Sequence, residues 1–416
     1  MIEYSRHILS NGLRVILHKD TTTPLIALNV LYDVGSADED PEHTGFAHLF
    51  EHLMFGGSEN VKDFDVPIQE AGGENNAFTN CDMTNFFDIL PAENIETAFW
   101  LESDRMRKLN FSQKNLTTQQ KVVIEEFKET SLNEPYGDMW HIMSDLAYGH
   151  HPYSWPTIGK EINHIADATL QQVKDFFYKY YRPKNAVLSL CGNFEEDEML
   201  SLIRKWFEDI EPGEAYPKDW QVQYIPPVSK TKRVEADVPA DALYMAFNMP
   251  GRLHPDYYTY DLLSDILSEG RSSRLYSELL KEKQLFASVD AYISGTNDPG
   301  LFIIEGKLMD DVGLEQATEE VWQILENIKT KGVGNRELDK VKHKTESNIA
   351  LSELSVLNKA ISLGYYELLG EIELINTESD YYNEVTTEDI QRVAKTLFDR
   401  EKYIQLEYKK KSSDRD

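Results

Sequence analysis

Cysteine, basic residues and long apolar runs are scarce in this 416-residue chain. With only Cys81 and Cys191, neither a disulfide framework nor a four-thiolate zinc site is available, so any metal must be bound by histidine and carboxylate. Lys and Arg number 42 against 72 Asp and Glu, and a net charge of −30 repels nucleic acid and anionic membranes. We therefore expect no nucleic-acid partner and no membrane partner.

Two further absences indicate where the protein works. No apolar run reaches the ~18 residues that a membrane-spanning helix needs. The first residues, Met1-Ile2-Glu3-Tyr4, lack the basic segment and apolar stretch of a secretory signal. We therefore expect a cytoplasmic protein.

The residues that are present predict an α+β fold. Hydrophobic residues make up 41% of the chain, and its length favours two or three domains. Strands are predicted at residues 13–17, 25–32 and 186–190, and the Asn11-Gly12 turn signal favours a β-meander at the start of the chain. Amphipathic helices are predicted at residues 46–55, 116–132 and 169–181.

The chain also shows signs of an internal repeat. Residues 26–34 resemble residues 242–250, and residues 48–57 align with residues 261–270 at nearly the same separation. Chance agreement between two amphipathic halves is the alternative to duplication. We predict two homologous αβ halves related by internal duplication, each a mainly antiparallel sheet with helices packed on one face.

A stretch rich in proline and glycine near the middle of the chain predicts the domain boundaries. We assign residues 214–232 to a linker, because prolines interrupt any sustained periodicity there. The predicted domains are an N-terminal α+β domain at residues 1–213 and a C-terminal α+β domain at residues 233–416.

The segment His48-Leu49-Phe50-Glu51-His52 carries the strongest chemical signal. On a helix, His48 and His52 lie one turn apart on one face, so both imidazoles can reach one metal ion. Glu51 lies beside them and is suited to take a proton from the attacking water in a hydrolase. The alternative is a pair of buried, hydrogen-bonded histidines on a core helix.

A catalytic zinc site needs a third protein ligand, and the helix pattern at residues 116–132 offers one. Glu125 and Glu126 interrupt an apolar helix face, where an unpaired charge is costly to bury. Adjacent helical residues diverge by about 100°, so only one of them can face the ion. We choose Glu126, because it shares a face with Val122 and Val123. The alternative is that both glutamates lie on a solvated surface.

These segments resemble the inverted zinc signature of the pitrilysin-type zinc metallopeptidases, the inverzincins. The resemblance runs nearly from end to end and includes Gly72-Gly73, Asn76-Ala77-Phe78-Thr79, His151-Pro152-Tyr153 and residues 270–275. It implies that His48, His52 and Glu126 bind one zinc ion per chain and that Glu51 is the general base. It also implies that Asn76, Ala77 and Phe78 lie on an edge strand that receives substrate.

Two positions depart from the family pattern. Gln119 stands where the family commonly has a glutamate that supports the metal site from outside, so hydrogen bonding is kept and a charge is lost. Leu280 and Ala287 stand where self-sufficient members have an Arg and a Tyr that point into the active site. The chain therefore resembles the zinc-bearing subunit of the processing-peptidase-like two-subunit members, whose partner supplies that pair. A homodimer and a monomer are the alternative arrangements.

The function implied is zinc-dependent endopeptidase activity. Unfolded peptides would bind as an added β-strand inside an enclosed chamber and be hydrolysed there. The alternative is a non-catalytic, structural or chaperone-like subunit of a peptidase-related assembly.

Overall fold

The computed structural model describes residues 1–214, 216, 218 and 228–411, which form two compact units. The first unit comprises Met1–Phe127, Trp155–Trp220 and Ile349–Glu378, and the second comprises Lys128–Ser154, Gln221–Asn348 and Ser379–Asp416. Each unit therefore contains a segment from the other half of the chain, whereas each predicted domain is one continuous stretch. Most of the predicted linker, residues 214–232, lies outside the described residues.

The first unit contains a six-stranded sheet with the order β1-β2-β6-β3-β5-β4. Its only parallel pair is β2 with β6, and the other neighbours are antiparallel. The strands are β1 (Ser5–Ile8), β2 (Arg14–Lys19), β3 (Leu25–Tyr32), β4 (Glu74–Thr79), β5 (Thr84–Pro91) and β6 (Ala186–Gly192).

The second unit contains a five-stranded sheet with the order β7-β11-β8-β10-β9. Here too one pair is parallel, β7 with β11, and the others are antiparallel. The strands are β7 (Lys230–Ala236), β8 (Ala242–Met249), β9 (Phe286–Ile293), β10 (Gly300–Leu308) and β11 (Tyr403–Lys410). Apart from β1, the two sheets have the same strand order and the same pairing directions, as duplication predicts.

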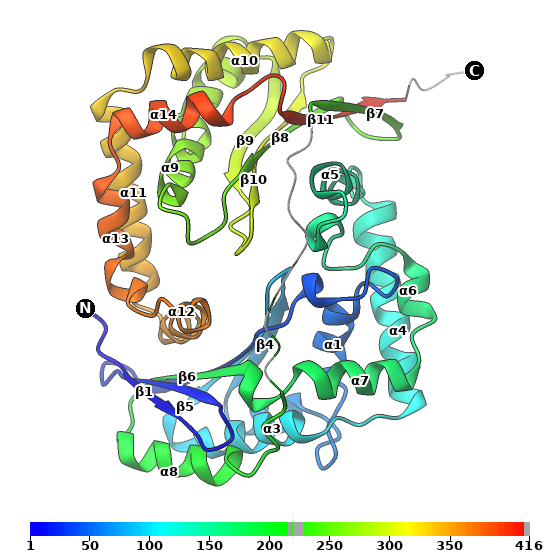
Figure 1. The fold of residues 1–416 in the computed structure, drawn as a ribbon, viewed down its shortest axis with the longest axis vertical. Helices are drawn as coiled ribbons and strands as arrows, with labels where there is room; N and C mark the ends of the chain where they lie inside the picture. The colour runs from blue at the N-terminus through cyan, green and yellow to red at the C-terminus, as the bar shows by residue number, and fades with distance from the viewer. Residues whose placement is uncertain (215, 217, 219–227, 412–416) are drawn as a thin grey trace. The chain divides into compact units, whose positions relative to one another are not determined.

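Most helices lie in the same compact unit as the strands of their own half of the chain (Figure 1). Those of the first half are α1 (Phe46–Phe55), α2 (Asp65–Glu70), α3 (Ile95–Arg107), α4 (Gln113–Phe127), α5 (Met139–Tyr148), α6 (Ile162–Ala166), α7 (Leu170–Tyr180) and α8 (Glu196–Phe207). Those of the second half are α9 (Tyr257–Ser268), α10 (Leu314–Lys331), α11 (Asn335–Ser352), α12 (Val356–Leu369), α13 (Leu374–Glu384) and α14 (Thr387–Leu397).

Several predicted elements match the structure closely. The strand at 25–32 and the helix at 46–55 have the predicted bounds. The predicted helix at 116–132 is α4, which passes into a π-helical turn at Lys128–Asn133. Capping boxes begin α7 at Thr169 and α14 at Thr386, so a threonine starts the equivalent helix in each half of the chain. Among the described residues, no helix combines the length and the apolar character needed to cross a membrane.

The predicted β-meander at the start of the chain is wrong. β1 and β2 form the expected hairpin, but β6 lies between β2 and β3. The reason is non-local: β6 comes from far along the chain, and its residues are all buried, so it takes a central place in the sheet.

The first sheet is covered on both faces. Alternate residues on its strands, such as Leu28 and Leu188, pack in the main core with α1, α3, α7 and α8. Residues of the opposite face, such as Ala27 and Val187, pack against α12. We predicted helices on one face of each sheet, and the structure adds α12, from the second half of the chain, on the other face of the first sheet.

Candidate metal centre

Helix α1 is fixed in the core by one face and presents its polar residues on another. Leu49, Phe50 and Leu53 are buried in the main core. The side chains of His48 and His52 are 13% and 25% exposed, so they lie at the border between core and solvent. The i, i+4 spacing therefore places both imidazoles on one side of the helix, as the sequence predicts.

The start of α1 is held by a buried carboxylate that the sequence reasoning missed. Glu39 accepts hydrogen bonds from the backbone N–H groups of Gly45 and Ala47, both at 2.8 Å, and from the Trp155 indole at 3.1 Å. Gly45 has a φ of +86°, and a Cβ there would lie 2.7 Å from the Ile165 side chain. Burial raises the pKa of Glu39 to about 8, although these hydrogen bonds oppose the shift.

The structure brings His48, His52 and Glu126 together. The two Nε2 atoms lie 3.4 Å apart, and Glu126 carboxylate oxygens lie 3.6 Å from His48 Nε2 and 3.3 Å from His52 Nε2. In a tetrahedral zinc site with bonds of about 2.0–2.1 Å, neighbouring ligand atoms are about 3.4 Å apart. The observed separations fit that spacing. Among the described residues, this is the one group of three His, Cys, Asp or Glu side chains that could hold a metal ion.

The protonation states of this group also suit a metal. Burial lowers the pKa of His48 to about 4, and the neighbouring His52 adds to the shift while Glu126 opposes it. A hydrogen bond with His52 and the charge of both histidines lower the pKa of Glu126 against the effect of burial. At neutral pH, His48 is therefore a neutral nitrogen donor and Glu126 is an anionic oxygen donor, which are the forms that bind zinc.

The two glutamates of α4 lie in different surroundings. Glu125 is exposed, whereas Glu126 is half-buried and contacts both histidines. Val122, which we took as part of the same apolar face, is 45% exposed, so the choice of Glu126 depended on Val123. Gln119 is half-buried and lies two turns before Glu126 on α4, about 10 Å along the helix axis.

Glu51 lies next to the metal group and contacts the edge strand β4. Its carboxylate Oε2 accepts a hydrogen bond of 2.6 Å from the Thr79 hydroxyl. Burial raises the pKa of Glu51, although the bond from Thr79 and the charge of His52 oppose the shift. The sequence reasoning did not assign Thr79 a role of its own.

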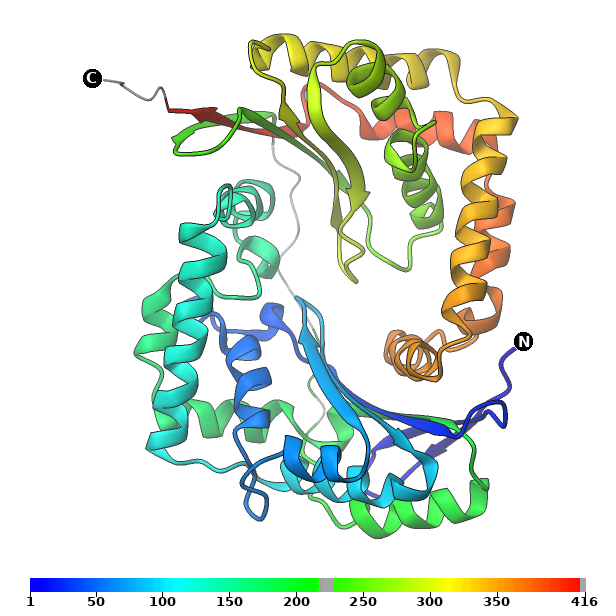
Figure 2. The same cartoon turned by 180° about the vertical axis from the view of Figure 1, so that it is seen from behind.

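The three predicted substrate-binding residues lie on β4, which is the edge strand beside α1 (Figures 1 and 2). Asn76 is exposed, and Ala77 and Phe78 are partly buried. The Ala77 N–H donates to the Asn76 side-chain oxygen at 2.8 Å and not to β5. Ala77 therefore directs its backbone polar groups away from the sheet, where an added strand would lie.

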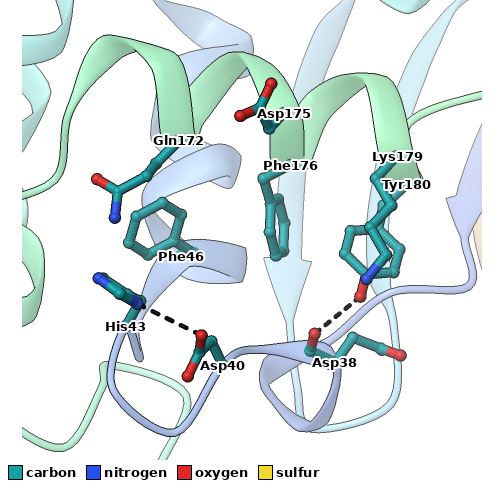
Figure 3. Close-up of a pocket in the computed structure, with 9 residues that line it drawn as sticks. All are labelled: Asp38, Asp40, His43, Phe46, Gln172, Asp175, Phe176, Lys179 and Tyr180. Carbon is teal, nitrogen blue, oxygen red and sulfur yellow. Dashed lines mark hydrogen bonds and ion pairs between the residues drawn. The ribbon is translucent and has the colours of Figure 1, made fainter.

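A separate pocket of about 320 Å³ lies between α7 and the loop before α1 (Figure 3). His43 pairs with Asp40 at 3.6 Å, and the Tyr180 hydroxyl donates to the Asp38 backbone oxygen at 2.9 Å. None of the predicted site residues lines this pocket. Its lining residues are Asp38, Asp40, His43, Phe46, Gln172, Asp175, Phe176, Lys179 and Tyr180.

Comparison with known protein families gives two matches along the chain. Residues 14–159 match the family described as insulinase, peptidase family M16, and this part contains His48, Glu51, His52 and Glu126. Residues 167–345 match the family described as the peptidase M16 inactive domain.

Individual relatives agree with these matches over nearly the whole chain. The zinc protease PqqE of Helicobacter pylori is 29% identical over 94% of this chain and 89% of its own length. The uncharacterized zinc protease YmxG of Bacillus subtilis is 27% identical over 94% of this chain and 95% of its own. A crystal structure of a protease from Helicobacter pylori superposes with a TM-score of 0.93 at 27% identity, covering 98% of this chain and all of that one. Pitrilysin, at 16% identity, shares the fold with a TM-score of 0.76 over 98% of this chain and 45% of its own.

Proposed function

This chain belongs to peptidase family M16, the pitrilysin-type peptidases whose relatives include named zinc proteases, and we propose that it is a zinc-dependent endopeptidase. The observation that carries the proposal is the convergence of His48, His52 and Glu126 beside Glu51. Two nitrogen donors and one carboxylate leave a fourth position open, which distinguishes a catalytic zinc site from a structural one.

His48, His52 and Glu126 would hold the zinc ion. When bound there, zinc lowers the pKa of water and polarises the scissile carbonyl. Glu51 takes the proton from the attacking water and passes it to the leaving amine. Partial burial raises the pKa of Glu51, which suits a carboxylate that must first accept and then release a proton.

Substrate binds as an added strand along β4. At the β4–β5 turn, the Asn80 N–H donates to the Met83 carbonyl, and hydrogen-bonded pairs alternate along an antiparallel ladder. The backbone groups of Asn76 and Phe78 therefore face β5. Those of Asn75, Ala77 and Thr79 point outward. Backbone pairing accepts many sequences but needs an extended peptide. The preferred substrate is therefore an unfolded segment that pairs with the outward backbone groups of Ala77 and contacts the side chains of Asn76 and Phe78. In this proposal it is hydrolysed in an enclosed chamber that excludes folded proteins.

The chain is the catalytic subunit of a two-subunit enzyme in this proposal. Leu280 lies in the π-helical segment Tyr276–Glu282, and Ala287 is exposed on β9. Neither side chain can donate a hydrogen bond to a peptide carbonyl, so a related subunit would supply the Arg/Tyr pair. A homodimer is the alternative assembly.

A non-catalytic role is the second candidate function. The match of residues 167–345 to a domain described as inactive favours it for that part of the chain. The His-His-Glu group lies outside that match and favours the enzyme.

Metal analysis and one substitution test the proposal. We expect about one zinc per chain and chelator-sensitive hydrolysis of an unstructured peptide. Glu51→Gln should keep the zinc and lower the rate of hydrolysis about 10²- to 10⁴-fold, because general base catalysis contributes about that much. Glu125→Gln, the same change at an exposed glutamate, is the matched control and should retain activity. Zinc-free wild-type protein that does not hydrolyse the peptide would support the non-catalytic role, whereas full turnover by Glu51→Gln would remove Glu51 from its role as the base.

A further inference from the structure

Thr79 occupies a position that joins two parts of the proposed site. Its backbone belongs to the edge strand β4, with its N–H and C=O on the side where an added strand would pair. Its hydroxyl donates to Glu51 Oε2 at 2.6 Å, which is short for a hydrogen bond and typical of one to a charged acceptor. The residue that ends the substrate strand is therefore also the residue that holds the proposed base.

The surroundings of Thr79 fix it with respect to α1. The backbone N–H groups of Ser36 and Ala37 donate to the carbonyls of Asn80 and Cys81, at 3.1 and 3.0 Å. The same loop continues to Glu39, whose carboxylate caps the N-terminus of α1. One short segment thus holds both the β4–β5 turn and the helix that carries Glu51.

The chemistry of the hydrogen bond explains what Thr79 contributes. A threonine hydroxyl can donate one hydrogen bond, and here Glu51 Oε2 is the acceptor. The bond restricts rotation of the carboxylate and leaves Oε1 available to the attacking water. Without the bond, Glu51 would sample orientations in which neither oxygen is placed for proton transfer, and small misplacements of a reacting group are costly.

We propose that Thr79 is a positioning residue that orients the Glu51 carboxylate and couples it to the strand that binds substrate. The inference rests on the proposed peptidase function and deepens it. It makes Thr79 a residue that acts on the catalytic step through Glu51, in addition to any backbone pairing of β4 with the peptide.

Kinetics of three variants test the effect on catalysis. Thr79→Val replaces the hydroxyl by a methyl group of similar size, and we expect kcat to fall about 10- to 100-fold with KM and zinc content nearly unchanged. Thr79→Ser keeps the hydroxyl and should restore most of kcat. Thr84→Val is the matched control, because Thr84 lies opposite Thr79 on β5 and donates instead to the Val34 carbonyl at 2.8 Å. It should lower stability and leave kcat within about twofold.

A double-mutant cycle in the metal-free protein tests the Thr79–Glu51 bond without any assay of activity. Thr79→Val should lower Tm in the wild type and have little further effect in a Glu51→Ala background. Additive Tm shifts, an unchanged kcat in Thr79→Val, a rise in KM alone, or no rescue by Thr79→Ser would each overturn the inference. If the zinc-loaded wild type does not hydrolyse peptides, the proposed function fails, and the cycle still decides whether Thr79 holds Glu51.

Discussion

The two compact units share one strand order but carry different side chains at equivalent positions of one helix. Helix α1 presents His48 and His52, whereas the repeat aligns these positions with Asp261 and Asp265 of α9. In the first unit, α4 adds the Glu126 carboxylate. In the second unit, α11 reaches Asp265 with the Thr345 hydroxyl at 3.4 Å. The fold therefore supplies the position of a site, and a few side chains decide its chemistry.

The acidic pair of the second unit, Asp261 and Asp265, makes hydrogen bonds within that unit. Asp261 accepts a short hydrogen bond from Tyr382, and Glu269 one turn further pairs with Lys344. Burial raises the pKa of Asp265 to about 7, and the negative charges of Asp261 and Glu269 add to the shift. A protonated Asp265 can remain half-buried without a cation, which is the opposite of what the first unit requires of Glu126.

The units also exchange equivalent helices. Helix α12, from the second half, covers the first sheet, and α5, from the first half, packs on β11 and β8 of the second sheet. Lys359 on α12 pairs with Asp20. At the start of α5, Asp138 accepts a short hydrogen bond from Tyr408 of β11. A buried ion pair holds the first exchanged helix, and a hydrogen bond donated by a tyrosine hydroxyl holds the second.

The largest effect is expected on zinc affinity, when one of the three residues of the metal group is removed. Glu126→Ala removes one of three ligands, so zinc affinity should fall by more than the 10- to 100-fold typical of outer-shell changes. Glu125→Ala, its exposed neighbour, should leave zinc affinity unchanged. Titration with a chromophoric chelator measures both. Equal zinc affinities for the two variants would contradict the assignment of Glu126.

The second prediction concerns the exchanged helices. Lys359→Met leaves the Asp20 carboxylate buried without its partner, and we expect a loss of about 3–5 kcal/mol in the free energy of unfolding, measured in urea. Tyr408→Phe in the second unit should cost only about 1.5–3 kcal/mol, the range for a hydrogen bond to a charged group. A larger loss in Tyr408→Phe would reverse the comparison.

The ion pair also sets a pH dependence. Burial opposes ionisation of Asp20, but hydrogen bonds from Lys359 and Thr22 outweigh it and lower the pKa of Asp20 well below its ordinary value. A carboxyl with a lowered pKa in the folded state contributes stability that is present above the unfolded pKa, about 4. The difference between wild type and Lys359→Met should therefore persist at neutral pH and shrink only in stronger acid.

The smallest effect is expected at Asp265. A carboxyl whose pKa is raised to about 7 on folding binds a proton that the unfolded chain releases, so stability falls as pH rises from about 4 to about 7. Asp265→Asn removes this dependence and should raise Tm at pH 8, by about 2–4 °C for each kcal/mol recovered. Below pH 4 the variant and wild type should melt alike. Asp339→Asn, an exposed change on α11, is the control, and an equal gain there would exclude the burial of Asp265 as the cause.

Local patterns predicted the elements that carry the candidate site. The apolar spacing of residues 46–55 predicted α1, and the nearly continuous apolar run at 25–32 predicted β3, because a buried helix face and a strand buried on both faces each leave a local pattern in the sequence. The duplication was also visible, since residues 26–34 and 48–57 recur at residues 242–250 and 261–270 with a nearly constant separation. The place of β6 was not visible, because its partners β2 and β3 are distant in the chain.

The missed residues share one physical property. Glu39 and Thr79 act through hydrogen bonds to groups outside their own elements, one to the start of α1 and the other to Glu51. A lone glutamate in a loop and a threonine in a strand have no spacing that indicates such a role. One signal for Glu39 was available in the sequence. It is an acidic residue that comes shortly before Gly45, the glycine at the start of α1.

The sequence by itself determined the helix of His48, Glu51 and His52, two similar halves and a short list of acids suited to complete a metal site. Those features depend on periodicity within a few turns or strands, which the chain encodes locally. Only the tertiary structure decided that Glu126 and not Glu125 lies within 3.6 Å of the histidines, that Thr79 holds Glu51, and that each unit takes a helix from the other half. These depend on how distant segments pack, and packing is settled by the burial of whole surfaces at once and not by any one segment.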